Sequence, residues 1–307
     1  MTTTTAPTRR RSIQPKFAPW LFLSPAIVLF VAFLILPMAY AIYLSFVALR
    51  VNGGAFGVRQ LTFVGFDNYV AAITDPELLA GLGRLLHFGL LSVPITLGGA
   101  LLLALLLDVP GVRLARFSRI SILLPYAVPG IVATLLWGFM YLPSTSPFNW
   151  MLKAVGLPAV DFLGPQGVFG ALANIAVWSG LGFNMIILYT ALRSIPLEIY
   201  EAAQLDGASE WQIAWRIKIP LLTPALLLTF IFSLLGTLQA YSEPMTLKSM
   251  SDSISSSFFP LMKVYRDAFA LDDTSGAAAM SVILALGTLV VSVLLLRVLQ
   301  RRTFEQS

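Results

Sequence analysis

The sequence predicts an all-α membrane protein with six transmembrane helices and with both the N and C termini in the cytoplasm. Three observations lead to this fold class: a high hydrophobic content, six long apolar stretches with almost no charge, and an uneven distribution of basic residues between them. Hydrophobic residues make up 57% of the 307-residue chain and charged residues 11%, with a mean hydropathy of +0.82. Because a soluble domain has about 25% charged residues, this composition predicts an integral membrane protein.

The first segment, residues 1–18, is rich in threonine and arginine and poor in apolar residues. We expect it to be a disordered cytoplasmic tail. The alternative, a cleaved secretory leader, requires a short apolar core and a cleavage site with small residues. The apolar run that follows, residues 17–49, is far longer than such a core, so the tail is the preferred interpretation.

Six stretches each supply the about 20 apolar residues that a helix needs to cross a bilayer. Five carry no charge, and the sixth contains only His87, which we expect to be structural because no carboxylate lies three or four residues from it. A 33-residue apolar run would make a helix about 50 Å long, so we expect bends or ends at Pro37 and at Pro143–Pro147. Within one transmembrane domain over residues 19–302, we place the membrane cores near 20–47, 85–107, 120–141, 169–191, 221–243 and 277–298.

Basic residues orient the six spans. With the N terminus inside, thirteen of the 20 lysines and arginines lie in cytoplasmic segments, whereas nine of the 15 acids lie outside. Lysine and arginine accumulate in cytoplasmic loops, so this distribution places the loop 193–219 in the cytoplasm. Topology therefore accounts for the net charge of +5. No basic run is interleaved with aromatics, so we expect no nucleic-acid partner.

The loop 193–219 begins with the signals of a short helix. Ser194 can cap its N terminus, and Pro196 suits its first turn. Gly207 suits the position just after the helix, where the backbone enters the left-handed region that glycine adopts at little cost. These signals predict a helix that stops at Gly207.

A second helix is predicted after the glycine. Ser209 and Gln212 have the spacing of a capping box, and Pro220 marks the start of the next membrane helix. Trp211 and Trp215 are four residues apart and form one apolar stripe, which could anchor the loop to its own bundle or enter the groove of a partner. From these signals alone, the loop could also be a plain amphipathic helix pair at the membrane surface.

The spacing within Glu201–Pro220 is more specific. It reads Glu-Ala-Ala, three residues, Gly207, nine residues, and Ile-x-Ile-Pro. This pattern resembles the EAA loop of the permease subunits of binding-protein-dependent ABC importers, with Ile219 in place of the usual leucine. The resemblance implies that the loop couples to a separate ATPase. The residues that it implicates in this coupling are Glu201, Ala202, Ala203, Asp206, Gly207 and Trp211.

The resemblance extends beyond the loop. Residues 17–46, 63–75 and 123–137 look like the sugar branch of these permeases, which includes the maltose, lactose and glycerol-3-phosphate importers. This implies a type I ABC importer transmembrane domain with its core at about 81–298 and with 193–219 as the cytoplasmic coupling loop. One stretch departs from the family: many relatives carry a Gly-rich turn where this chain has TLKSMSDSISSS at 246–257.

The resemblance also implies a solute path along the two spans that flank the loop. Residues there combine aromatic faces with hydroxyl, amide and carboxyl groups, as a sugar site requires. The alternatives are an interfacial aromatic belt, close packing of helices through small residues, and, for Glu243, an exposed interfacial acid. The candidate path residues are Trp178, Ser179, Gly180, Phe183, Asn184, Thr237, Gln239, Tyr241 and Glu243.

The resemblance implies a permease that works with a second permease subunit, an ABC ATPase dimer and an extracytoplasmic solute-binding protein in a bacterial plasma (inner) membrane. The chain has no phosphate-binding loop, because no glycine is followed by lysine, and no HExxH or GxSxG motif. We therefore expect no catalysis and no cofactor bound by this chain, with ATP and Mg²⁺ on the partner ATPase. The alternative function is a secondary transporter or channel driven by an ion gradient.

Overall fold

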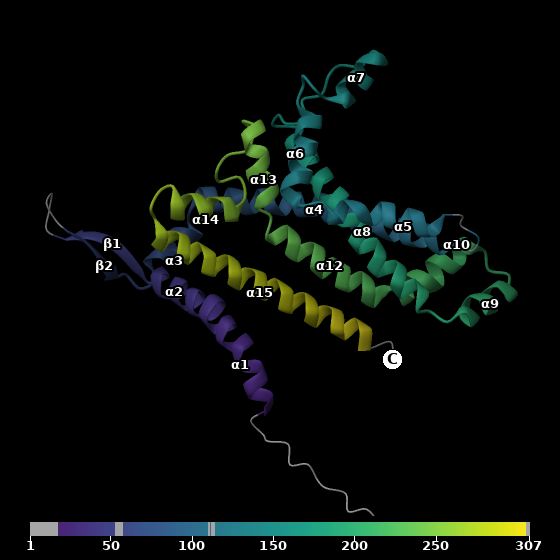
Figure 1. Cartoon of the computed structure of the whole chain (residues 1–307), viewed down its shortest axis with the longest axis horizontal. Coiled ribbons are helices and arrows are strands. Elements are labelled where there is room, and N and C mark those ends of the chain that lie inside the picture. The colour runs from purple at the N-terminus through teal and green to yellow at the C-terminus, as the bar shows by residue number, and fades with distance from the viewer. Residues whose placement is uncertain (1–17, 53–57, 110, 112–113, 305–307) are drawn as a thin grey trace, which may run out of the picture.

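The computed structural model describes residues 18–52, 58–109, 111 and 114–304 (Figure 1). All of the predicted tail except Ala18 lies outside these residues. The elements in chain order are α1 (Ala18–Phe30), η1 (Val31–Ile35), α2 (Leu36–Ser45), β1 (Val47–Asn52), β2 (Val58–Phe63), α3 (Asp67–Ile73), α4 (Pro76–Asp108), α5 (Ala115–Leu123), η3 (Leu124–Ala127), α6 (Gly130–Tyr141), α7 (Pro147–Ala154), α8 (Val168–Arg193), α9 (Leu197–Leu205), α10 (Glu210–Ile213), η4 (Ala214–Lys218), α11 (Ile219–Leu221), α12 (Thr223–Leu238), α13 (Ser242–Leu247), η5 (Lys248–Met250), α14 (Pro260–Phe269) and α15 (Thr274–Phe304).

Four of the six predicted spans are single helices that are long and apolar enough to cross a membrane. They are Pro19–Ser45, Pro76–Asp108, Val168–Arg193 and Thr274–Arg297. The other two predicted spans are pairs of helices: the segments on either side of Val128–Pro129 meet at 95°, and those on either side of Leu222 meet at 66°. The described part of the chain therefore has four spanning helices, or six if each bent pair is one span.

The first span keeps its helix across Pro37. A π-helical turn, η1, directly precedes α2, whose first turn contains this proline. A π-helical turn accommodates the carbonyl group that proline cannot bond. The second predicted break is also observed, because α6 ends at Tyr141 and α7 restarts with Pro147 in its first turn.

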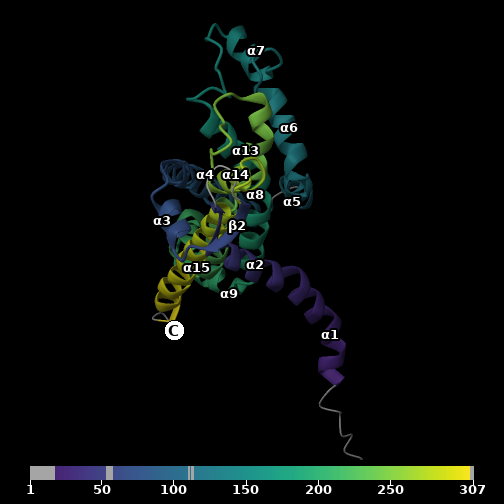
Figure 2. The same cartoon turned by 90° about the vertical axis from the view of Figure 1, so that its left-hand side faces the viewer.

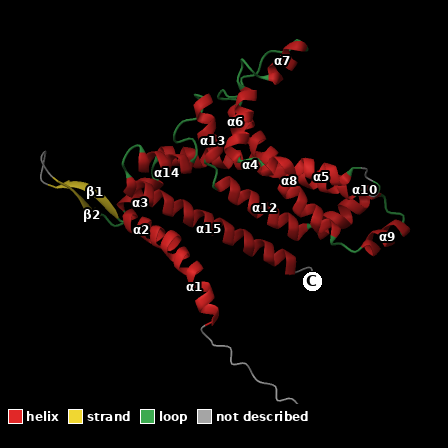
Figure 3. Cartoon of the chain, viewed as in Figure 1, coloured by secondary structure: helices red, strands yellow, loops and turns green. Residues whose placement is uncertain are grey.

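The structure corrects two predictions about the elements. It is not wholly α-helical, since β1 and β2 pair as an antiparallel hairpin with Val47 opposite Phe63 (Figure 3). The span predicted at 221–243 ends at Leu238. The chain turns after Gln239 and restarts as α13, which has Pro244 in its first turn, where the missing N–H of proline is not needed.

The helices α4 and α8 pack along one another at the centre of the bundle. Small residues allow close approach: Ala100 and Ala104 of α4 are fully buried, and a Cβ at Gly99 of α4 would lie 3.0 Å from the Leu181 side chain of α8. Small residues at helix contacts are typical of membrane bundles. We call the end of α4 near the β-hairpin, α3 and α14 the hairpin end, and the end near α9 and α10 the loop end (Figure 1).

The first span is the least sheltered element. None of its most apolar window is buried against the rest of the chain, and α1 diverges from the bundle in both views (Figures 1 and 2). Large side chains such as Phe22 and Phe33 are exposed along it. This apolar surface must therefore be covered by lipid or by another subunit.

Candidate functional site

The first helix of the 193–219 loop, α9, ends as its sequence predicts. Gly207 has a φ of +80°. Its amide donates to the carbonyl oxygen of Gln204, and the amide of Ala208 donates to that of Ala203, at 3.0 Å each. This pair of bonds is the Schellman motif, which satisfies the free carbonyl groups at a helix end and requires a left-handed residue at Gly207.

The second helix also begins as predicted. The Ser209 hydroxyl accepts from the amide of Gln212, and the Gln212 side chain accepts from the amide of Ser209, so both bonds of the capping box are present. A bond of 3.0 Å from the Gln204 side chain to the Glu210 carboxylate joins the two helices. The turn around Gly207 thus has a defined geometry.

Ser194 does not cap α9, contrary to the prediction. Its hydroxyl donates instead to the carbonyl oxygen of Ala191 in α8, at 2.7 Å. Ser194 is the C-terminal cap of α8, and Pro196 occupies the N-cap position of α9 without a side-chain bond. The serine lies two residues before the N-cap position, because the chain uses Ile195 and Pro196 to leave α8 and start α9.

The prediction that Pro220 begins the next membrane helix is also wrong. The helix that starts at Glu210 continues through η4 and α11 to Leu221, and the membrane helix α12 begins at Thr223 after the bend at Leu222. Leu222 is buried in the core with Met185 and Leu188 of α8. The bend is thus held in the core, and the loop is joined covalently to α12 through it.

Most of the residues implicated in ATPase contact lie on the outer surface of the loop. Glu201, Ala202, Asp206 and Trp211 are exposed, and Ala203 is half-buried. Trp211 is 71% exposed, and its ring lies 5.6 Å from that of Trp215, which is also exposed. The described part of the bundle does not cover this tryptophan pair.

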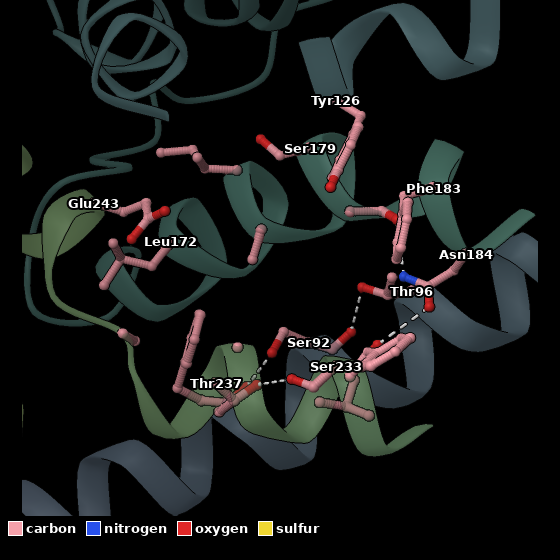
Figure 4. A pocket seen from close by; sticks show the side chains of 18 of the residues that line it. Ser92, Thr96, Tyr126, Leu172, Ser179, Phe183, Asn184, Ser233, Thr237 and Glu243 are labelled. Atoms are coloured by element: carbon pink, nitrogen blue, oxygen red, sulfur yellow. Dashed lines mark hydrogen bonds between the residues drawn. The ribbon is translucent and has the colours of Figure 1, made fainter. Parts of the chain in front are cut away.

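A cavity of about 400 Å³ lies between α4, η3, α8, α12 and the start of α13 (Figure 4). Its size is in the range of small-molecule sites, which is roughly 300 to 1,000 Å³. Of the nine predicted path residues, the structure brings six to its wall, and Trp178, Gln239 and Tyr241 lie elsewhere. The six are Ser179, Gly180, Phe183, Asn184, Thr237 and Glu243.

The three remaining path residues have other contacts or exposure. Trp178 packs edge-on against Trp137, at 5.9 Å between ring centroids, and Tyr241 packs against Tyr265 at 5.6 Å. Gln239 is the exposed cap of α12. The chain turns after α12 ends at Leu238, and of the residues beyond it Ala240 and Glu243 line the cavity instead.

Sequence reasoning missed the wall that α4 contributes. Ser92 and Thr96 line the cavity from α4, and Tyr126 lines it from η3. The signal for the first two was present, since two hydroxyl residues four apart lie on one face of a helix within an otherwise apolar run. The resemblance implies a path only along the spans on either side of the 193–219 loop, and α4 is not one of them.

The polar groups of the cavity are arranged mainly to accept hydrogen bonds. The hydroxyls of Ser92, Thr96 and Thr237 each donate to the carbonyl oxygen four residues earlier, at 2.8 to 2.9 Å (Figure 4). Each hydrogen is used in the helix, but each oxygen still has a free lone pair. The Asn184 amide bridges α8 to Ser233 of α12.

Aromatic and charged groups complete the wall. The rings of Tyr126 and Phe183 stack with a centroid distance of 4.8 Å and an angle of 16°. The Glu243 side chain extends from α13 toward the middle of the cavity (Figure 4). A Cβ at Gly130, the first residue of α6, would lie 3.5 Å from the Glu243 carboxylate, so the positive end of the α6 dipole lies beside it.

The atypical stretch 246–257 is fixed to the bundle. The Ser251 hydroxyl donates to the carbonyl oxygen of Leu163 at 2.6 Å. The guanidinium of Arg84 in α4 donates to the carbonyl oxygens of Ser257 and Phe258, at 2.8 and 2.7 Å. The stretch therefore has its own supports in place of a Gly-rich turn.

Comparison of the sequence with known proteins identifies a family to which it is similar. The profile of the binding-protein-dependent transport system inner membrane component matches residues 90–305. The sn-glycerol-3-phosphate transport system permease protein UgpA of Brucella suis biovar 1 is 31% identical over 272 residues, which cover 88% of this chain and 90% of that protein. The osmoprotective compounds uptake permease protein GgtC of a Synechocystis species is 35% identical over 214 residues, covering 67% of this chain and 73% of that protein.

A solved structure has the same fold. The chain superposes on a bacterial alginate ABC transporter, solved in complex with an alginate pentasaccharide-bound periplasmic protein, with a TM-score of 0.81. The sequence identity is 23%, and the match covers 94% of this chain and 95% of that one. This likeness extends over nearly the whole bundle.

Proposed function

This chain belongs to the family of binding-protein-dependent transport system inner membrane components, and from that premise we propose what it carries and how it is driven. It is a multi-pass permease subunit of an ABC importer. We propose that it forms half of the path for a carbohydrate or a similar polyhydroxylated solute. We propose that a separate ATPase supplies the energy for transport and acts on the permease through the 193–219 loop.

The observation that carries the solute class is the wall of the 400 Å³ cavity. Its free lone pairs on Ser92, Thr96 and Thr237 suit the many hydroxyl donors of a sugar, and the stacked rings of Tyr126 and Phe183 suit its apolar ring face. Among the described residues that line the cavity, Glu243 alone is charged. This half of the path therefore favours a neutral solute over a phosphorylated one.

The assembly follows from the surfaces. We place the loop end in the cytoplasm, because basic residues are concentrated on that side, and the hairpin end outside the inner membrane, where a solute-binding protein would dock. The exposed Glu201, Asp206 and Trp211 form the contact with the ATPase dimer, and Gly207 fixes the turn between them. A second permease subunit supplies the other half of the path and covers part of the first span.

ATP hydrolysis belongs to the partner in this proposal. The chain has no phosphate-binding loop in its sequence, so ATP and Mg²⁺ are bound by the ATPase. Closure of the ATPase pair moves the loop and switches the bundle between two states. The family favours this mechanism over the alternative of a transporter driven by an ion gradient.

Uptake by the complete reconstituted importer tests the proposal. Glu201→Lys and Gly207→Leu should abolish uptake of radiolabelled sugar and the retention of the ATPase on the purified permease, while membrane insertion stays normal. The first reverses a charge at the contact, and the second places a side chain at a φ of +80°. Arg116→Glu, which reverses an exposed charge of α5 outside the loop, is the matched control. Normal uptake in both loop variants would refute the ATPase contact.

A further inference from the structure

A buried ion pair joins the 193–219 loop to α4. The Lys218 ammonium lies 2.6 Å from the carboxylate of Asp108, the last residue of α4, although 110 residues separate them. The two side chains are only 7% and 4% exposed. Charged side chains are rarely buried unless they are paired, so this contact fixes the position of both elements.

Two further groups close around the pair. The ring of Tyr200, from α9, lies 4.9 Å from the Lys218 ammonium, and the Arg193 guanidinium, at the end of α8, lies 3.9 Å from the Asp108 carboxylate. Burial, and then the negative charge of Asp108, raise the pKa of Tyr200. The pair thus lies where α4, α8 and both halves of the loop meet, at the wall of a cavity of about 440 Å³.

The local backbone directs Lys218 inward. It is the last residue of η4, the π-helical turn that interrupts the helix between α10 and α11. A π-helical turn holds more residues than an α-helical turn and so shifts the face on which the following residues lie; such turns are frequent at functional sites. While Trp211 and Trp215 remain exposed, Lys218 is buried.

The partner of Lys218 is on the helix that forms one wall of the candidate solute cavity. Ser92 and Thr96 line that cavity from α4, and twelve residues separate Thr96 from Asp108. At 1.5 Å per residue, the joint lies about 18 Å along the same helix from the cavity. A displacement of Asp108 along or about the helix axis therefore displaces the cavity wall.

We propose that the Asp108–Lys218 pair is the joint through which the 193–219 loop moves α4. The loop then acts on both walls of the cavity at once: on α12 through the covalent bend at Leu222, and on α4 through this pair. This inference rests on the proposed function, because it assigns the loop its role in coupling. Asp108 and Lys218 are positioning residues, since neither touches ATP or lines the solute cavity.

An ion pair suits such a joint because of its geometry. Burial of two charges contributes little net stability, but removal of one partner leaves the other uncompensated. The pair therefore imposes one arrangement and penalises others. Its loss should disturb the transmission of movement more than the attachment of the ATPase, whose contact lies on the outer surface of the loop.

The test uses the complete importer in proteoliposomes with its solute-bound binding protein. Two readouts are the number of ATP molecules hydrolysed per solute imported and the amount of ATPase retained by the permease. In Lys218→Met and Asp108→Asn, uptake should fall by about tenfold while the ATPase is retained and hydrolysis continues. Lys218→Arg keeps the charge and should keep most of the uptake.

Matched controls distinguish the joint from general damage. Arg116→Gln removes an exposed charge of α5, outside the 193–219 loop and the hairpin end, and should leave both readouts unchanged. If the charge variants fail to assemble, Tyr200 provides a milder series. Tyr200→Leu removes the ring beside Lys218 and should raise the ATP consumed per solute, whereas Tyr200→Phe retains the ring and should not.

The outcomes separate this inference from the proposed function. The joint is refuted if Lys218→Met imports as much solute per ATP as the unmodified importer, or if Tyr200→Leu and Tyr200→Phe behave alike. It is also refuted if uptake falls only in proportion to the ATPase retained. If the pair variants are silent while Glu201→Lys abolishes uptake, only the joint fails. If Glu201→Lys is silent as well, the proposed function of the loop fails.

Discussion

The two ends of α4 are both tied by ion pairs to helices that follow much later in the sequence, but the two ties differ in number and exposure. At the loop end, one buried contact of 2.6 Å joins Asp108 to Lys218, with Arg193 at 3.9 Å. At the hairpin end, Lys263 of α14 alone contacts three carboxylates within 3.3 Å. The loop end of α4 depends on one close ion pair. At the hairpin end the contacts are shared among several charged groups.

The network at the hairpin end is built on the start of α4. Asp75 caps the helix, because its carboxylate accepts from the amide of Leu78 at 2.9 Å. The same carboxylate lies 3.0 Å from Lys263, and the neighbouring Glu77 pairs with both Lys263 and Arg266. Loss of one of these contacts leaves the others in place.

The comparison indicates different mechanical roles for the two ends. A redundant network holds one arrangement and suits a fixed anchor for α14 and the 246–257 stretch. The buried Asp108–Lys218 pair, the one ion pair between α4 and η4 among the described residues, can transmit a displacement from one to the other. The following changes test this difference, in order of decreasing effect.

The largest loss of stability is expected for Lys218→Met. It leaves the buried Asp108 without its main partner, which costs about 3 to 5 kcal/mol in comparable sites. The double variant Asp108→Leu/Lys218→Met should recover most of this loss, because an apolar pair of similar volume carries no desolvation penalty. Thermal unfolding of the detergent-solubilised permease measures both, and equal destabilisation in the two variants would contradict the explanation.

A smaller loss is expected for Arg84→Ala at the hairpin end. It removes two hydrogen bonds from the guanidinium to the carbonyl oxygens of Ser257 and Phe258. Because this side chain is partly exposed, water replaces part of what is lost, and the net cost should be about 1.5 to 3 kcal/mol. The 246–257 stretch should then become accessible to limited proteolysis, whereas ATP consumed per solute stays unchanged. Lys153→Ala, at an exposed lysine of α7, is the control, and unchanged proteolysis in Arg84→Ala would count against a supporting role for these bonds.

Glu77→Gln should have a modest effect. Its carboxylate is half-exposed and shares its cations with Asp75 and Asp267. Exposed ion pairs contribute about 0.2 to 1 kcal/mol, so the unfolding temperature should change little. A loss as large as that of Lys218→Met would show that the hairpin end also depends on a single contact.

The smallest effect is a dependence on pH. Burial opposes ionisation of Asp75, but the Leu78 amide and Lys263 outweigh it and lower the pKa of this carboxyl. A lowered pKa in the folded state contributes stability above the unfolded value of about 3.9, and this contribution is lost as the pH falls through the folded pKa.

Asp75→Asn isolates that charge, since asparagine caps a helix about as well as aspartate. The difference in unfolding temperature between the two proteins should therefore be present at neutral pH and disappear in acid. A difference that persists unchanged below the folded pKa would rule out the charge as its origin. Lys263→Arg, which retains the partner charge, serves as the control.

The sequence predicts the features of this molecule that depend on neighbouring residues. Gly207 and the Ser209–Gln212 pair define the turn within the loop because a helix end is set by hydrogen bonds over a few residues. The apolar runs locate the spans because a span is likewise recognised from consecutive residues. The end of α12 differs from the prediction because the apolar run continues past Leu238, whereas the chain turns there and Pro244 lies in the first turn of a separate helix, α13.

Features that depend on distant parts of the chain were not predicted. Nothing in the sequence near Asp108 or Lys218 indicates that they pair across 110 residues. From the sequence, Lys218 is only one of the basic residues that mark the cytoplasmic side. The cavity wall from α4 was missed likewise, since Ser92 and Thr96 come to one cavity with Asn184 and Thr237 only after α4, α8 and α12 have packed.

The π-helical turn η4 gives a physical meaning to the length of the loop. Nine residues separate Gly207 from Ile217, and they fit because η4 takes up one residue more than a regular α-helical path. Deletion of one residue from Ala214–Ile217 would convert η4 to a regular helical turn and leave Lys218 facing Asp108, whereas insertion of one residue would rotate Lys218 by about 100° away from it. The spacing that identifies the segment is therefore a register, and a single added codon would break the joint without changing any residue that forms it.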